Sequence, residues 1–333
     1  MKALFKIAVP VVLIASLAAC GGGGSDPAPA PTPEITIDPL VPIYTQADIK
    51  NVANLAVLAS SLTGSRVVPG LEYLGESLRG LADDTGGSRE ISAQPCLSEG
   101  VGSGTVSVSL WKTSAHTGLR PGEMVTFTYD HCDVGGTGVV VNGTASLVAQ
   151  GAVQASTSGG TDVSFEATLT GFSVTAGALV THYDGVTEMI GNSVESDTVV
   201  GRMAIPTGKS LSIVLSGGAP DFHMSYPERT IFAGTDATGP TGTSVKLDGS
   251  VYIDSSSGFL QLDVATPAAL IGTTTEGGKF VATSGNLSVR LPAQPLVTSV
   301  VVNGAQVTIS GDVDNNGSMD KVFTLTWDEL VAP

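Results

Sequence analysis

The sequence predicts a mainly β protein of the α+β type, in which a large antiparallel sheet follows a short helical segment. Three observations lead to this prediction. Hydrophobic residues alternate with Ser and Thr over most of the chain, 42 Gly and 18 Pro occur among 333 residues, and only 14% of the residues are charged. Alternation with a period of two is typical of strands with one buried and one solvated face, and frequent Gly and Pro indicate many turns.

The first residues have the features of an export signal. Lys2 and Lys6 flank the start of an apolar run that extends from Ile7 to Ala19. This run is too short to cross a bilayer as a helix, which takes about 20 residues. Residues 1–19 are therefore predicted to be a signal peptide.

The segment Leu17-Ala18-Ala19-Cys20 resembles the lipobox of bacterial lipoproteins. The resemblance implies that the signal is cut before Cys20 and that this residue carries acyl chains, palmitate among them, which anchor the protein in a membrane. Gly21 follows, where that family's inner-membrane retention signal would be Asp, so the resemblance implies the bacterial outer membrane. The alternative is an ordinary secretory signal that ends in Cys.

Residues 20–39 are predicted to be a linker that follows the lipidated cysteine. Four consecutive Gly residues begin at Gly21, and they are followed by prolines at positions 27, 29, 31, 33 and 39. A glycine run is flexible, whereas the Pro-rich part favours an extended, stiff conformation. We expect a tether that holds the folded part away from the membrane, and we exclude it from the fold.

A helical segment is predicted for residues 40–86. Thr45 and Asp48 have the spacing of a capping box, and Gly64 follows the last residue of a helical pattern. The apolar positions of this first helix are Ile49, Val52, Ala56, Ala59 and Leu62. A second helix is predicted from Pro69 to about Ala82, with leucines at positions 71, 74, 78 and 81 on one face.

Residues 87–333 are predicted to form the antiparallel β domain. Alternating runs occur at Val106–Leu110, Val125–Tyr129, Val163–Leu169, Leu211–Leu215, Val245–Leu247, Leu287–Leu291 and Phe323–Trp327. Asn-Gly pairs at 142–143, 303–304 and 316–317 are turn signals between or within such runs. About a dozen or more strands are too many for a flat sheet. We expect a large curved sheet or partial barrel around the helical pair, with a two-sheet sandwich as the alternative.

Two cysteines remain once Cys20 is assigned to lipid. Cys96 and Cys132 are predicted to form a disulfide, because an oxidising compartment favours pairing of two remaining thiols. The alternative is a redox or metal site in the segment Asp130-His131-Cys132-Asp133. No CxxC spacing accompanies it.

One segment has the composition of a cation site. Asp312, Asp314, Asn316, Ser318 and Asp320 place oxygen-bearing residues at alternate positions, and Gly317 allows a sharp turn. The segment is similar to the DxDxNG calcium loops of EF-hands and bacterial surface modules, which implies calcium as a possible cofactor. Phe323 replaces the bidentate Glu of an EF-hand, and Ser318 would contribute a backbone carbonyl. The alternative is a polar hairpin tip.

The net charge and the motifs of the sequence limit the functions that the protein can have. A formal net charge of −16 repels phosphates and argues against a nucleic-acid partner. The sequence shows no nucleophile elbow or phosphate-binding loop and predicts no catalytic residue, so we expect a noncatalytic binding or structural role, periplasmic or surface-facing. Expected partners are envelope polysaccharide or a protein. The alternatives are a carrier of lipid or another apolar ligand, and a hydrolase whose carboxylates converge only in the fold, such as Asp130, Asp133, Asp184 or Asp254.

Overall fold

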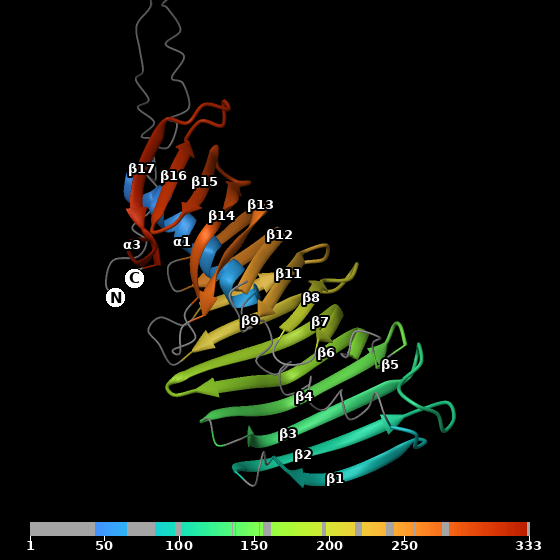
Figure 1. Cartoon of the computed structure of the whole chain (residues 1–333). Helices are drawn as coiled ribbons and strands as arrows, with labels where there is room; N and C mark the ends of the chain where they lie inside the picture. Colours follow the sequence, from blue (N-terminus) through green and yellow to red (C-terminus); the bar gives the residue numbers. More distant parts are fainter. Residues whose placement is uncertain are drawn as a thin grey trace, which may run out of the picture.

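The protein is described by a computed structural model that places residues 44–64, 84–96, 101–134, 136, 138–152, 154–155, 161–194, 198–216, 222–237, 243–255, 258–274 and 280–331. These residues form one antiparallel sheet of 17 strands, with helix α1 (Gln46–Gly64) packed against part of it (Figure 1). The predicted mainly β fold with one large curved antiparallel sheet is confirmed. The two-sheet sandwich is wrong, because all described strands are hydrogen-bonded into one sheet.

The sheet contains strands from almost the whole length of the described chain after α1. They are β1 (Arg89–Pro95), β2 (Gly102–Trp111), β3 (Met124–Val134), β4 (Val139–Ala149), β5 (Gln154–Ala155), β6 (Thr161–Ala176), β7 (Leu179–Val194), β8 (Thr198–Ala204), β9 (Leu211–Ser216), β10 (Phe222–Tyr226), β11 (Ile231–Ala237), β12 (Thr243–Ser255), β13 (Gly258–Thr274), β14 (Phe280–Leu291), β15 (Leu296–Asn303), β16 (Gln306–Asp312) and β17 (Lys321–Thr326).

The sheet is a meander with a closed ring of strands in the middle. On one side β1, β2, β3, β4, β6 and β7 pair in that order, and on the other side β12 to β17 pair in sequence order. Between them, one half of β7 pairs with β9 and the other half with β8. The pairs β9–β10 and β8–β11 then both reach β12, which closes a ring of six strands.

A line of β-bulges crosses the first part of the sheet. The register shifts between Tyr129 and Cys132 in β3, and again between Asn142 and Thr144 in β4. Gly143 has a φ of 95°, and a Cβ there would lie 2.1 Å from the carbonyl oxygen of Gly171. The Asn142-Gly143 turn signal is therefore a bulge within β4. Because bulges bend and twist strands, the line accounts for curvature of the sheet.

The first predicted helix is confirmed, with its capping box. The Thr45 amide donates to Asp48 Oδ2 at 2.8 Å, and the Asp48 amide donates to Thr45 Oγ1 at 3.2 Å. These bonds satisfy amides that a helix start leaves without intrahelical partners. The predicted second helix, Pro69 to Ala82, lies outside the described residues, as do the predicted signal peptide and linker.

The last predicted strand is partly wrong. Phe323 and Leu325 lie in β17 as expected, but Trp327 begins the short helix α3 (Trp327–Val331). A second capping box explains the change, because Thr326 and Glu329 exchange hydrogen bonds of 2.7 and 3.2 Å. The Trp327 indole then donates to the Phe280 carbonyl at 3.1 Å, which holds α3 against the sheet.

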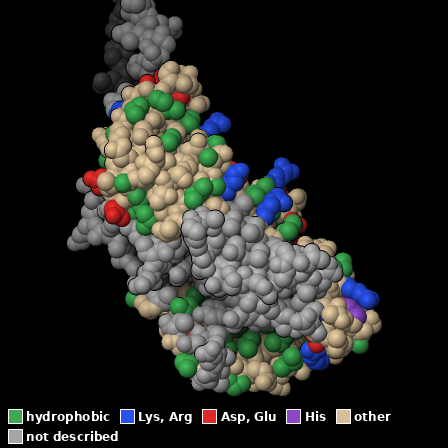
Figure 2. All heavy atoms as spheres, viewed as in Figure 1, with side chains coloured by type: hydrophobic (Ala, Val, Ile, Leu, Met, Phe, Trp, Pro, Cys, Tyr) green, Lys and Arg blue, Asp and Glu red, His purple; other side chains and the backbone are tan. Residues whose placement is uncertain are grey.

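The core lies on one face of the sheet. Helix α1 contacts β11, β12 and β14 to β16, and its Ile49 packs so closely on β16 that a Cβ at Gly311 would lie 2.6 Å from Ile49 Cδ1. Near the end of α1, the buried Tyr226 hydroxyl donates to the Ala59 carbonyl at 3.3 Å. The opposite face of the sheet is rich in Ser and Thr. The face shown in Figure 2 carries few charged side chains over the part that Figure 1 labels β13 to β17.

Candidate functional site

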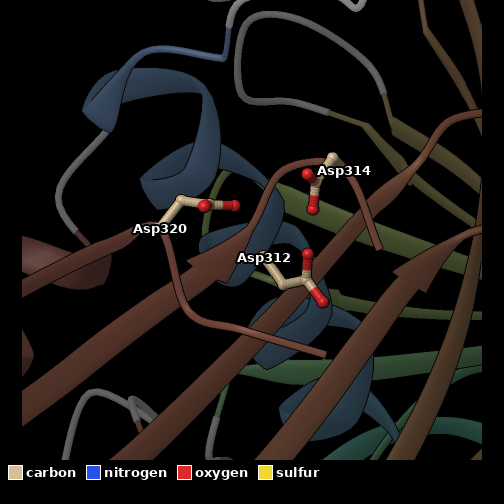
Figure 3. Close-up of side chains that lie close together, drawn as sticks. All are labelled: Asp312, Asp314 and Asp320. Atoms are coloured by element: carbon tan, nitrogen blue, oxygen red, sulfur yellow. The ribbon is translucent and has the colours of Figure 1, made fainter. Parts of the chain in front are cut away.

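The predicted cation loop connects β16 to β17. Asp312 ends β16, and Asp320 immediately precedes β17. In Figure 3, Asp312, Asp314 and Asp320 lie around this connection, and one carboxylate oxygen from each lies within 4.8 Å of the others. The sequence therefore correctly identified a local cluster of carboxylates. Its flanks are strands, so the loop is not part of an EF-hand.

Backbone amides of the loop hold the buried Asp312 carboxylate. The Gly317 amide donates to Asp312 Oδ2 at 2.7 Å, and the Asn316 amide donates to Oδ1 at 3.1 Å. Burial on its own would raise the pKa of Asp312, but these amides outweigh it and the pKa is lowered. The Asp312 carboxylate is therefore ionised at neutral pH.

The other predicted ligands form hydrogen bonds with one another and with backbone amides of the loop. The Asn316 side chain donates to Asp314 Oδ2 at 2.8 Å, and its oxygen accepts a hydrogen bond of 2.7 Å from the Ser318 amide. Asn316 thus lies beside the cluster, with its side-chain oxygen engaged in the turn. Asp320 in turn accepts from the Val313 amide at 2.9 Å. The loop combines the turn chemistry of a polar hairpin tip with a gathering of carboxylates.

The carboxylate spacing is compatible with metal binding. Ligands of Ca²⁺ lie about 2.3–2.6 Å from the ion, so two oxygens on opposite sides of it are about 5 Å apart. Three oxygens within 4.8 Å of one another fall inside that limit. Hard cations prefer such oxygen ligands. Asp312, Asp314 and Asp320 are the side chains that could hold the ion.

The predicted disulfide between Cys96 and Cys132 is confirmed. The two Cα atoms are 5.4 Å apart, and both residues are buried. Cys96 directly follows the edge strand β1 and Cys132 lies in β3, so the bond ties β1 to β3 across β2. Cys132 is bonded to Cys96, so it is not a free thiolate ligand for the alternative redox or metal site at Asp130-His131-Cys132-Asp133. Cys20 lies outside the described residues.

The four carboxylates considered for a hydrolase do not converge. Asp130 and Asp133 lie on β3, Asp184 on β7 and Asp254 on β12. Strands β4 and β6 separate β3 from β7, which amounts to about 14 Å at the usual strand spacing. Two strands also lie between β7 and β12 on either side of the ring, β9 and β10 or β8 and β11. Asp130 instead pairs with the neighbouring imidazole, its Oδ1 lying 2.6 Å from His131 Nδ1.

The sequence reasoning missed an aromatic pair on the solvent face of the sheet. Tyr252 of β12 and Phe259 of β13 stack with ring centroids 5.6 Å apart and ring planes 21° apart. Phe259 is 68% exposed. The signal was present in the alternation of β12, where buried Val251 and Ile253 predict that Tyr252 points outward. The pairing with Phe259 depends on the strand register.

Among the described residues, no helix has the length and apolar character needed to cross a membrane. The chain matches no protein-family model, no curated protein and no solved structure.

Proposed function

We propose that this protein is a lipid-anchored envelope protein of a bacterial outer membrane and that it acts by binding, without catalysis. The lipobox-like segment that ends at Cys20 supports the anchor, and the Pro-rich linker supports display of the β domain away from the lipid, on the periplasmic or the outer side. The observation that carries the binding role is the solvent face of the sheet.

Two rows of hydroxyl groups cross this face, and we call them the hydroxyl rows. Paired residues of β2, β3, β4 and β6 form them: Ser109, Thr126, Ser146 and Thr168 in one row, and Ser107, Thr128, Thr144 and Thr170 in the other. Thr126 and Ser146 lie 3.0 Å apart, within hydrogen-bonding distance. Hydroxyls both donate and accept, so a rigid strand array presents a regular polar surface that suits a polar ligand.

The anchor is tested by the intact mass of the protein purified from bacterial membranes. We expect the mass of a chain that begins at Cys20 and carries acyl groups, and we expect Cys20→Ser to release the protein from the membrane fraction. Loss of an acylated residue removes the buried methylene groups, each worth about 0.8 kcal/mol of membrane affinity. Native mass spectra of the same sample also reveal any co-purified apolar ligand. A wild-type mass that still includes residues 1–19, or an unmodified Cys20, contradicts the proposal.

We propose further that the β16–β17 loop binds calcium through Asp312, Asp314 and Asp320. Three neighbouring carboxylates repel one another, and a divalent cation removes that repulsion. At a calcium concentration about 20 times the Kd, binding adds about 1.8 kcal/mol of stability, equivalent to roughly 3–6 °C in Tm. We expect Asp314→Asn to abolish this shift, because Asp314 is exposed and its replacement keeps the side-chain shape.

The matched control is Glu188→Gln, which removes one exposed negative charge from β7, outside the loop. This variant should respond to calcium as the wild type does. Calorimetry and thermal unfolding are the suitable measurements of calcium binding. The fluorescence of Trp327 would report poorly on the loop, because this residue follows the far end of β17 and is buried against Phe280. An unchanged wild-type Tm at 10 mM calcium, about ten times the weakest Kd of extracellular sites or more, would show that the loop is only a hairpin tip.

A further inference from the structure

The solvent face of β10, β12 and β13 carries an aromatic and polar surface, which we call the Tyr252–Phe259 patch. It consists of His223, Ser225, Tyr252, Asp254, Phe259 and Gln261. The register places these residues in two adjacent rows. His223, Asp254 and Phe259 are directly paired in one row, and Ser225, Tyr252 and Gln261 are directly paired in the other.

The patch points outward because its neighbours point into the core. Met224, Val251, Ile253 and Leu262 alternate with its members and are buried. His223, Asp254 and Phe259 are exposed. An aromatic side chain that is two-thirds exposed leaves apolar area in water, and its stacking on Tyr252 fixes the ring in place. The ring is thus a rigid flat platform.

Polar groups lie beside this platform, on β13 itself and on β12 and β10 to one side of it. Asp254 is the direct cross-strand partner of Phe259, and Gln261 is the partner of Tyr252. On β10, His223 Nε2 lies 2.8 Å from the Ser212 hydroxyl of β9, which orients the imidazole. Carboxylate, amide, imidazole and hydroxyl groups provide donors and acceptors within about 10 Å, which is two strand spacings.

From this arrangement we infer that the Tyr252–Phe259 patch binds a neutral polysaccharide, with a sugar ring stacked on Phe259 and its hydroxyls bonded to Asp254 and Gln261. The inference rests on the proposed binding function and names its ligand. A sugar ring has an apolar face of C–H groups and an edge of hydroxyls, so it matches a flat aromatic surface that has acceptors and donors beside it.

Charge decides between neutral and anionic glycans. The patch contains the exposed carboxylate of Asp254, and the chain has a formal net charge of −16. Both repel polymers that carry phosphate or carboxylate groups. An uncharged glycan of hexose or N-acetylhexosamine units avoids this repulsion. The two rows extend over three strands and could contact neighbouring units of one glycan chain.

The test measures binding of two neutral probes to the full-length protein. The probes are laminarin, a β-glucan, and chitohexaose, an oligomer of N-acetylglucosamine. The protein is kept in lauryldimethylamine oxide, because this detergent has no sugar headgroup that could compete. We expect calorimetric binding of at least one probe and a Kd about tenfold weaker for Phe259→Ala, which corresponds to the loss of one aromatic contact. Asp254→Ala should also weaken binding.

Val322→Ala is the control, since Val322 is a 61% exposed apolar residue of β17, away from both the hydroxyl rows and the Tyr252–Phe259 patch. This variant should bind the probes like the wild type, and unchanged thermal unfolding of all variants excludes a folding effect. If neither probe binds the wild type, or if Phe259→Ala binds equally well, the inference is wrong. The proposed anchored function fails separately, when the intact mass shows an unmodified Cys20, so the two failures can be distinguished.

Discussion

Replacing Glu123 by Ala is expected to lower the free energy of unfolding by about 2–4 kcal/mol. Glu123 ends the connection from β2 to β3, and its side chain is fully buried. Its Oε1 accepts hydrogen bonds from the amide and the hydroxyl of Thr113, both at 2.7 Å, and its Oε2 accepts from the Arg120 amide at 2.9 Å. His116 Nε2 lies 3.0 Å from the same Oε2. The variant removes the acceptor for every one of these groups, and urea unfolding measures the loss.

The contribution of Glu123 should also depend on pH. Burial on its own would raise the pKa, but the hydrogen bonds from Thr113 and Arg120, together with His116, lower it from 4.5 to about 2. A lowered pKa in the folded state stabilises the fold above the unfolded-state value, and this stability is lost as the pH falls from about 4.5 to 2. The stability difference between the wild type and Glu123→Gln should therefore shrink over that range.

Glu90→Ala is the control for this effect. Glu90 also accepts a hydrogen bond from a neighbouring strand, at 2.5 Å from the Ser109 hydroxyl, but it is exposed. Water replaces an exposed partner at little cost, so the change should stay within about 0.5 kcal/mol. Equal losses for Glu90→Ala and Glu123→Ala would show that burial of the Glu123 carboxylate does not matter to stability.

Removing the disulfide by the double substitution Cys96→Ser and Cys132→Ser is expected to cost about 3–4 kcal/mol. The bond closes a loop with a sequence separation of 36, and without it the unfolded chain gains conformational freedom. Both sulfurs are also buried, so each serine hydroxyl has to find a hydrogen-bond partner in the protein. The midpoint of urea unfolding should fall accordingly.

The disulfide should stabilise the edge of the sheet at β1 more than the rest of the protein. Strand β1 is at an edge of the sheet and pairs with β2 alone among the described strands. Removal of the bond to Cys132 should increase the hydrogen-exchange rate of the β1 amides over their wild-type rate. The increase should be larger than for the amides of β15, which lies between β14 and β16. An equal increase of the exchange rate in β1 and in β15 would contradict a local role for the disulfide.

Local chemistry explains what could be predicted about the candidate metal loop and the first helix. The carboxylates of Asp312, Asp314 and Asp320 lie within nine residues of one another, so a single turn brings them together. The same holds for Thr45 and Asp48, which are three residues apart and form the expected capping box. In both cases the interacting groups are close in sequence. Calcium binding and the lipid anchor stay predictions until they are measured.

Contacts between distant segments explain what could not be predicted. His223 lies beside Asp254, 31 residues further along the chain, only because β10 pairs with β12, and even Tyr252 and Phe259, seven residues apart, stack only because β12 and β13 pair in one register. A shift by one residue would turn each of these side chains to the other face. The alternation in the sequence predicts which side chains point outward, but it does not specify the partner strand.

The sequence by itself determined the β character of this protein, its first helix with the cap, the pairing of Cys96 with Cys132, and the acidic loop at 312–320. Each of these depends on a local pattern or on the number of cysteines. Only the tertiary structure decided that the described strands form a single sheet and that β7 and β12 close a ring. These features arise from pairings between segments far apart in the chain, whose energies depend on register and burial and leave no signature within a short stretch of residues.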